Sequence, residues 1–193
     1  MQTHIRRFVE IVIETLPLAQ PVYEFGALQV QEDPSEEDLR TLFNQVEYVG
    51  CDFRDGPGVD RILNLHAIDL PDRTAGTVIS MDTLEHVEYP RQAMSEIHRL
   101  LTHDGIVIIS SVMNFPIHSY PNDYWRFTPE GFRSLLQDFA HCFVGSCGAQ
   151  ENFPLSIVGI GFKSAPPDLA AFNSAYAQWH AWTTGVMKAL NED

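Results

Sequence analysis

The residues between Asp82 and His118 include side chains whose types and spacing suit proton transfer. Asp82, Glu85 and His86 lie within the short segment "MDTLEHV", and His118 follows further along the chain. A histidine can accept a proton from a reacting hydroxyl or amine, and a nearby carboxylate can orient its ring. We therefore predict His86 and His118 as catalytic bases and Asp82 as the catalytic residue that orients them. The alternative is that His86 only braces its loop.

A second segment, residues 113–132, combines aromatic side chains with prolines and an arginine. Aromatic faces can enclose a sulfonium cation or stack on a ring, and an arginine can bind a carboxylate or phosphate through two hydrogen bonds. The residues predicted to bind substrate are Tyr120, Tyr124, Trp125 and Arg126. The alternative is structural: the aromatic rings pack the loop onto the core, and Arg126 pairs with an acid such as Asp123.

Two β-prone runs end at residues that could hold a nucleotide-like ligand. The stretch "VYEFGALQV", residues 22–30, contains a β-prone run that ends at Gly26, and Asp52 closes the next run. An acidic residue at the end of the second strand can accept hydrogen bonds from both hydroxyls of a ribose. The alternative for Asp52 is a solvated side chain at a strand end.

Seven β-prone runs alternate with helical segments along the chain. The runs are residues 22–25, 46–52, 62–65, 77–81, 106–112, 142–146 and 155–162. Such alternation predicts an α/β fold with a doubly wound, parallel sheet. We expect one domain over residues 1–193, with an N-terminal helix in 1–18, the sheet core in 20–163 and a C-terminal helix in 166–190. A capping box predicts a further short helix over residues 35–43.

The segment 81–111 carries a pattern of spaced residues that identifies a family. It reads Asp-x-x-Glu-His-hydrophobic, then a helix that starts at a proline and ends in Arg-x-Leu, then a glycine turn into a strand. The matching residues are Asp82, Glu85, His86, Pro90, Glu96, Arg99, Leu100 and Gly105. This pattern resembles class I S-adenosylmethionine-dependent methyltransferases. Together with "VYEFG" and "IDLPD", the resemblance covers roughly residues 20–140.

The resemblance implies a fold, a cofactor and an activity. The fold would be a Rossmann-like, seven-stranded, mostly parallel sheet with an antiparallel last strand and helices on both faces. S-adenosylmethionine would be the methyl donor and S-adenosylhomocysteine the product. A small-molecule or saccharide-like acceptor would receive the methyl group. The residues expected to hold or support the cofactor are Glu24, Gly26, Asp52, Asp69 and Asp82.

The chain departs from the family at the turn after its first strand. The family commonly has acidic-x-Gly-x-Gly-x-Gly there, whereas this chain has Glu24 and Gly26 followed by Leu28 and Val30 at the later glycine positions. Glycine at such positions lets backbone amides approach a cofactor. An alternative therefore stays open: a catalytically inactive, methyltransferase-like binding or assembly protein. A nicotinamide-dependent oxidoreductase has less support, because no Gly-x-Gly-x-x-Gly turn is present.

The composition argues against several other classes of protein. A formal net charge of −14 does not suit nucleic-acid binding, which requires basic patches. No apolar run is long enough to cross a membrane, and the first segment reads as an amphipathic helix rather than a secretion signal. Three cysteines without metal-ligand spacing predict free thiols, a cytoplasmic location and no metal site. The expected partners are a small-molecule acceptor and a second copy of the chain.

Overall fold

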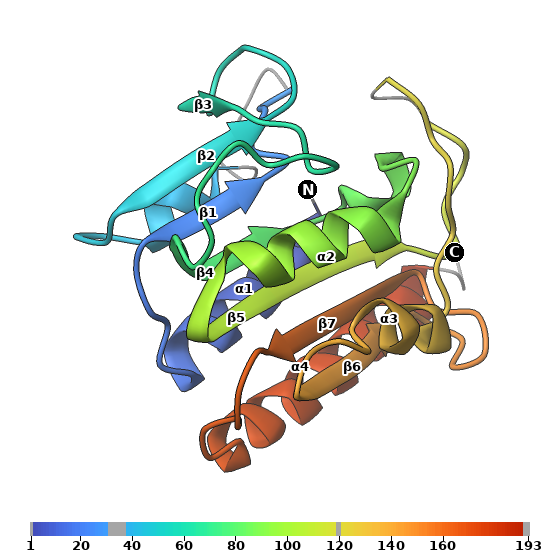
Figure 1. Ribbon diagram of the computed structural model, residues 1–193. Coiled ribbons are helices and arrows are strands. Elements are labelled where there is room, and N and C mark those ends of the chain that lie inside the picture. Colours follow the sequence, from blue (N-terminus) through green and yellow to red (C-terminus); the bar gives the residue numbers. More distant parts are fainter. Residues whose placement is uncertain (1, 31–37, 119–120, 191–193) are drawn as a thin grey trace.

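The computed structural model describes residues 2–30, 38–118 and 121–190, which form a seven-stranded sheet covered by helices (Figure 1). The strand order is β3-β2-β1-β4-β5-β7-β6, and β7 runs antiparallel to both of its neighbours. The strands are β1 (Val22–Phe25), β2 (Tyr48–Asp52), β3 (Arg61–Ile62), β4 (Ala75–Ser80), β5 (Leu101–Val112), β6 (His141–Cys147) and β7 (Ser156–Phe162). The predicted α/β fold with an antiparallel last strand is confirmed.

Helices cover both faces of the sheet, as the sequence predicts. Figure 1 shows α2 (Pro90–Leu100) and α3 (Pro129–Leu135) on the near face, with α1 (Thr3–Thr15) and α4 (Ala170–Leu190) on the far face. Two short 3-10 helices are η2 (Leu39–Leu42) and η3 (Leu84–His86). Among the described residues, no helix is long and apolar enough to cross a membrane.

The apolar side chains of the central strands alternate between two cores. In β5, Val107 and Ile109 belong to the core beneath α2 and α3, whereas Ile106 and Ile108 belong to the core beneath α1 and α4. Successive side chains of a strand point to opposite faces of the sheet. Because both faces are covered by helices, the strand appears in the sequence as a continuous apolar run.

Two elements are shorter than the sequence predicts. Of the run at 62–65, only Ile62 pairs with β2, because the chain after Ile62 leaves the sheet and buries Leu63 and Leu65 in the core beneath α2. Of the helix predicted over 35–43, residues 35–37 lie outside the described residues, and the described part contains η2.

Helix α2 holds the segment that precedes β4. The guanidinium of Arg99 donates to the carbonyl oxygens of Ile68 and Leu70, at 2.8 and 2.9 Å. Glu96 accepts a 2.8 Å hydrogen bond from the N–H of Ile68 and pairs with Arg99 at 2.9 Å. These two residues of the family pattern therefore hold residues 68–70, which follow the stretch 63–66 that lines the cavity described below.

Phe8 tests the packing of α1 against α4. Its side chain is fully buried, and its ring contacts those of Phe172 and Trp179. Phe8→Ala should lower the free energy of unfolding in urea by about 3–5 kcal/mol, because it leaves a cavity between the two helices. The adjacent Arg7 has a 45% exposed side chain, so Arg7→Ala should change that free energy by less than about 1 kcal/mol. Equal losses would contradict the described orientation of α1.

Candidate functional site

A cavity of about 460 Å³ opens at the carboxyl ends of β1, β2 and β4. The chain order of the strands reverses between β1 and β4, which is where doubly wound sheets bind their ligands. The cavity is lined by residues 24–30, 52–54, 63–66, 81–83 and 85–88, and by Gln2, Val112, Phe115, His118, Pro121, Asn122 and Tyr124.

The turn after β1 requires glycine at its first position. Gly26 has φ +90°, and a Cβ added there would collide with the hydroxyl of Thr83. The N–H groups of Gly26 and Ala27 both donate to the carbonyl oxygen of Cys51, at 2.9 and 3.0 Å. These bonds fasten the turn to the end of β2, so residues 24–30 form one wall of the cavity.

The glycines that make room for this turn lie in the neighbouring loop. A Cβ at Gly56 would collide with the side chain of Leu28, and a Cβ at Gly58 would collide with the carbonyl oxygen of Ala27. The loop after β2 therefore provides the space that the bulkier turn occupies. Residues 24–30 all line the cavity, so the absence of later glycines in the turn does not close it.

Asp52 lies where β2 ends and meets the cavity. Its side chain is 6% exposed, and one carboxylate oxygen accepts hydrogen bonds from the backbone and side chain of Arg54, at 2.9 and 3.3 Å. Phe53 follows it and is 51% exposed. A fixed carboxylate beside an aromatic face can hydrogen-bond to a ribose while the ring stacks on the attached base.

Glu24 lies in the same wall, near the end of β1. Its carboxylate accepts a 2.6 Å hydrogen bond from the hydroxyl of Tyr48. Burial raises the pKa of Glu24 to about 7, and the hydrogen bond from Tyr48 opposes that increase. This carboxyl group therefore changes its charge near neutral pH.

Asp82 follows β4 and is held by Ser110 of β5. The N–H of Asp82 donates to the Ser110 hydroxyl oxygen at 2.9 Å, and that hydroxyl donates to the Asp82 carboxylate at 2.7 Å. Asp82 has φ +46°, a backbone conformation that costs energy for a residue with a side chain. The two hydrogen bonds fix its carboxylate in the cavity wall.

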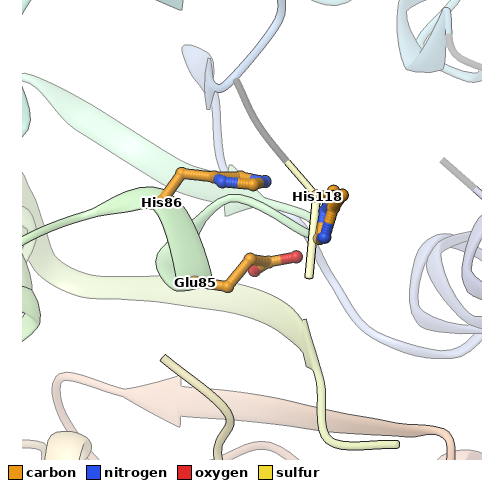
Figure 2. A group of neighbouring side chains, drawn as sticks. All are labelled: Glu85, His86 and His118. Carbon is orange, nitrogen blue, oxygen red and sulfur yellow. The ribbon is translucent and has the colours of Figure 1, made fainter. Parts of the chain in front are cut away.

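Glu85, His86 and His118 meet on the opposite side of the cavity (Figure 2). The centroids of the His86 and His118 imidazole rings are 4.7 Å apart, and the rings meet edge to face. The Nδ1 atom of His86 lies 2.6 Å from the carbonyl oxygen of Asn122, so Nδ1 carries a proton and Nε2 is the acceptor in the neutral ring. Burial lowers the pKa of His86, which favours this neutral, proton-accepting form.

The loop that carries His118 is held together by Arg126. Its guanidinium donates to both carboxylate oxygens of Asp123, at 2.6 and 2.7 Å, and to the carbonyl oxygens of Phe115 and Pro116, at 3.1 and 2.8 Å. These contacts hold the pKa of the Asp123 carboxyl well below its usual range. Arg126 therefore has the structural role given above as the alternative, and it does not line the cavity.

The cavity gathers some of the predicted site residues and leaves out others. The predicted residues that line it are Glu24, Gly26, Asp52, Asp82, His86, His118 and Tyr124. Asp69 is exposed away from it, because Arg99 holds both neighbouring carbonyl groups against α2. Trp125 is also outside, with its Nε1 donating to the carbonyl oxygen of Val87 at 3.0 Å. Tyr120 lies outside the described residues.

Phe53 and Glu85 line the cavity and had no role assigned from the sequence. Phe53 directly follows Asp52, so the position of a strand end is a signal that could have identified it. Glu85 matched the family pattern only as a motif residue. Its complete burial beside two histidines depends on how distant segments pack, which the local sequence does not reveal.

Comparison with known proteins agrees with the resemblance predicted from residues 81–111. Residues 27–109 match the methyltransferase domain family. The structure resembles a SAM dependent methyltransferase from Archaeoglobus fulgidus, with a TM-score of 0.64, 14% identity, and coverage of 82% of this chain and 93% of that one. Among curated proteins, none matches the sequence significantly.

Two further solved structures show the same fold. The 1,6-didemethyltoxoflavin-N1-methyltransferase from Burkholderia thailandensis, solved with 1,6-didemethyltoxoflavin and S-adenosylhomocysteine, has a TM-score of 0.60, 14% identity, and coverage of 83% of this chain and 77% of that one. The CMeT domain of the citrinin polyketide synthase has a TM-score of 0.63 and 14% identity over 84% of this chain. This chain spans 52% of the length of that domain structure.

Gly26→Ala tests the turn after β1. The variant should lower the free energy of unfolding by about 1–3 kcal/mol, because alanine disfavours the required φ and its Cβ meets Thr83. Gly185 in α4 is the control, since a Cβ there meets nothing within 4 Å. Gly185→Ala should instead stabilise the protein by about 0.5–1 kcal/mol in the same urea titration. A neutral effect of Gly26→Ala would argue against this turn.

Glu24→Gln tests the raised pKa by its effect on pH dependence. The folded state binds a proton at Glu24 more tightly than the unfolded chain, so this stabilisation is complete below the ordinary pKa of 4.5 and is lost as pH rises through about 7. Glutamine removes that loss. Urea titrations from about pH 4.5 to 8 should show wild type losing up to about 3 kcal/mol relative to the variant.

Tyr48→Phe provides the matching control for Glu24. It removes the hydrogen bond that lowers the pKa of Glu24, so the loss of stability should move to higher pH. Parallel pH profiles for wild type and both variants would contradict a raised pKa at Glu24.

Proposed function

We propose that this chain methylates a small-molecule acceptor in the cavity described above, with S-adenosylmethionine as the methyl donor. The proposal starts from the match of residues 27–109 to the methyltransferase domain family and from the fold shared with a SAM dependent methyltransferase. The observation that carries this proposal is the continuity of the cavity, which extends from Gly26 and Asp52 to His86 and His118. Its volume of about 460 Å³ falls within the range of small-molecule sites, about 300–1,000 Å³.

The residues at the ends of β1 and β2 suit the cofactor. Asp52 would accept hydrogen bonds from the ribose hydroxyls, and the exposed face of Phe53 would stack on adenine. Gly26 and Asp82 border the space for the methionine part, while Glu24 supports the turn. When bound, S-adenosylmethionine supplies a methyl group on a sulfonium sulfur, and S-adenosylhomocysteine remains as product.

The acceptor side would provide orientation and a base. Methyl transfer is an in-line displacement in which the sulfur keeps the electron pair of the broken bond, so orientation of the acceptor supplies much of the acceleration. Phe115 and Tyr124 line this side and can hold a ring or a saccharide face. The neutral His86 ring would accept the proton that the acceptor nucleophile loses, with His118 beside it.

Two further expectations belong to this proposal. All three cysteines are free thiols, which supports a cytoplasmic location, because thiols persist in reducing compartments. The homodimer expected from the sequence stays a prediction. Trp182 and Val186 of α4 are 45% and 41% exposed, and they are the residues to examine for it.

The alternative is a methyltransferase-like binding protein that no longer transfers methyl groups. It was motivated by Leu28 and Val30 at the later glycine positions. Filling of the space beside Gly26 by these side chains would have favoured it. The open cavity that reaches Asp52 supports the enzyme instead.

Calorimetric titration with S-adenosylhomocysteine tests the cofactor site. We expect Asp52→Ala to weaken binding about 10- to 100-fold, because it removes charged hydrogen-bond acceptors for the ribose. Asp55 is an exposed acid in the same loop, and Asp55→Ala should leave the affinity unchanged. No binding to wild type at millimolar ligand would reject the enzyme and favour the binding protein.

A further inference from the structure

We propose that Glu85, His86 and His118 bind a divalent transition-metal ion, with Zn²⁺ as the preferred ion, on the acceptor side of the cavity. One ligand atom from each residue, a carboxylate oxygen or a ring nitrogen, lies within 4.8 Å of the other two. Figure 2 shows the three side chains pointing toward a common point. Two imidazoles and one carboxylate suit zinc and related ions, and such a set leaves coordination positions open for another ligand.

An unpartnered oxygen on Glu85 points independently to a cation. The Glu85 side chain is completely buried, and its Oε2 accepts a 2.7 Å hydrogen bond from the hydroxyl of Ser111. Its Oε1 is buried without any hydrogen-bond partner among the described residues. A buried carboxylate oxygen without a partner is costly, and a bound cation would remove that cost.

In both histidines, Nδ1 already contacts an acceptor oxygen, as the nitrogen that does not bind the ion does in most metal sites. Nδ1 of His86 lies 2.6 Å from the carbonyl oxygen of Asn122. Nδ1 of His118 lies 3.2 Å from the carbonyl oxygen of Pro116 and 3.2 Å from the carboxylate of Asp123. Metal-binding histidines donate their second N–H to carbonyl or carboxylate oxygens, which fixes the ring and directs the other nitrogen to the ion. The nitrogen left to coordinate is therefore Nε2 in both rings.

The backbone also joins the segments that carry these ligands. The carbonyl oxygen of Glu85 accepts hydrogen bonds from the N–H groups of Tyr124 and Trp125, at 2.8 and 3.2 Å. His118 belongs to the same loop, and its N–H donates to Asp123 at 2.8 Å. The ligand geometry is thus supported from both sides before an ion arrives.

The ion has a specific role if the proposed methyl transfer is correct, and this part rests on that proposal. His86 and His118 line the cavity, so the open positions of the ion would face the acceptor. An acceptor hydroxyl bound there would have a lower pKa and would lose its proton to water in the cavity. This would replace the direct transfer to His86 described above, because the ion would occupy Nε2 of that ring. The acceptor class is therefore an alcohol or phenol that binds the ion through its reacting oxygen.

Titration of the tag-free, chelator-treated protein with Zn²⁺, followed by calorimetry, tests the site. We expect one ion per chain at this site in wild type. Ser111→Ala removes only the hydroxyl that hydrogen-bonds to Glu85, so it should weaken Zn²⁺ binding about 10- to 100-fold. Glu85→Gln and His118→Asn each remove a ligand, so each should weaken Zn²⁺ binding by more than that. His103 is exposed and remote from the three ligands, so His103→Asn should leave the affinity unchanged.

Co²⁺ provides a second readout, because its visible absorption reports nitrogen and carboxylate coordination and should disappear in the ligand variants. Circular dichroism of the metal-free variants checks folding, and the half-buried His118 carries the test if Glu85→Gln does not fold. Absent Zn²⁺ binding, or equal binding by wild type and both ligand variants, would overturn the site. Binding of S-adenosylhomocysteine to chelator-treated protein tests the proposed function separately.

Discussion

The buried side chain of Glu85 links the sheet to the loop on the acceptor side of the cavity. Its carboxylate accepts from Ser111 of β5, and its carbonyl oxygen accepts from the backbone of Tyr124 and Trp125. Burial and the nearby charge of Asp82 raise the pKa of Glu85 to about 8. A cation in contact with the carboxylate would have the opposite effect and favour its charged form. The charge of Glu85 therefore depends on whether a cation lies beside it, and this decides whether the acceptor side of the cavity presents a neutral carboxyl group or a metal ligand.

The glycines that the turn after β1 needs are divided between that turn and the loop after β2. Gly26 is needed where the chain turns, but Leu28 is accommodated because Gly56 lies opposite it. At such a contact, close packing is satisfied when either partner lacks a side chain, because the other then occupies the space between the two backbones. A motif written along a single segment does not contain this information.

Much of the fold could be predicted from the sequence, whereas the site could be predicted only in part. Apolar runs and the 81–111 pattern located the strands and the helix at Pro90, because these depend on local periodicity. Asp69 and Arg126 lie outside the cavity. Arg99, about 30 residues further along the chain, holds the backbone on both sides of Asp69. Arg126 instead pairs with Asp123, three residues away, which is the alternative that the sequence left open. The meeting of His86 with His118 depends on the path of a long loop, which no local pattern encodes.

The two ends of the described chain close the same face of the sheet. Phe8 of α1 packs on Trp179 of α4, and the indole N–H of Trp179 donates to the carbonyl oxygen of His4 at 2.9 Å. A ribosome releases α1 before α4, so the apolar surface of α1 and the strands beneath it lacks its cover until residues 170–190 emerge. A nascent chain that stalls earlier exposes this surface, which makes it a natural substrate for chaperones.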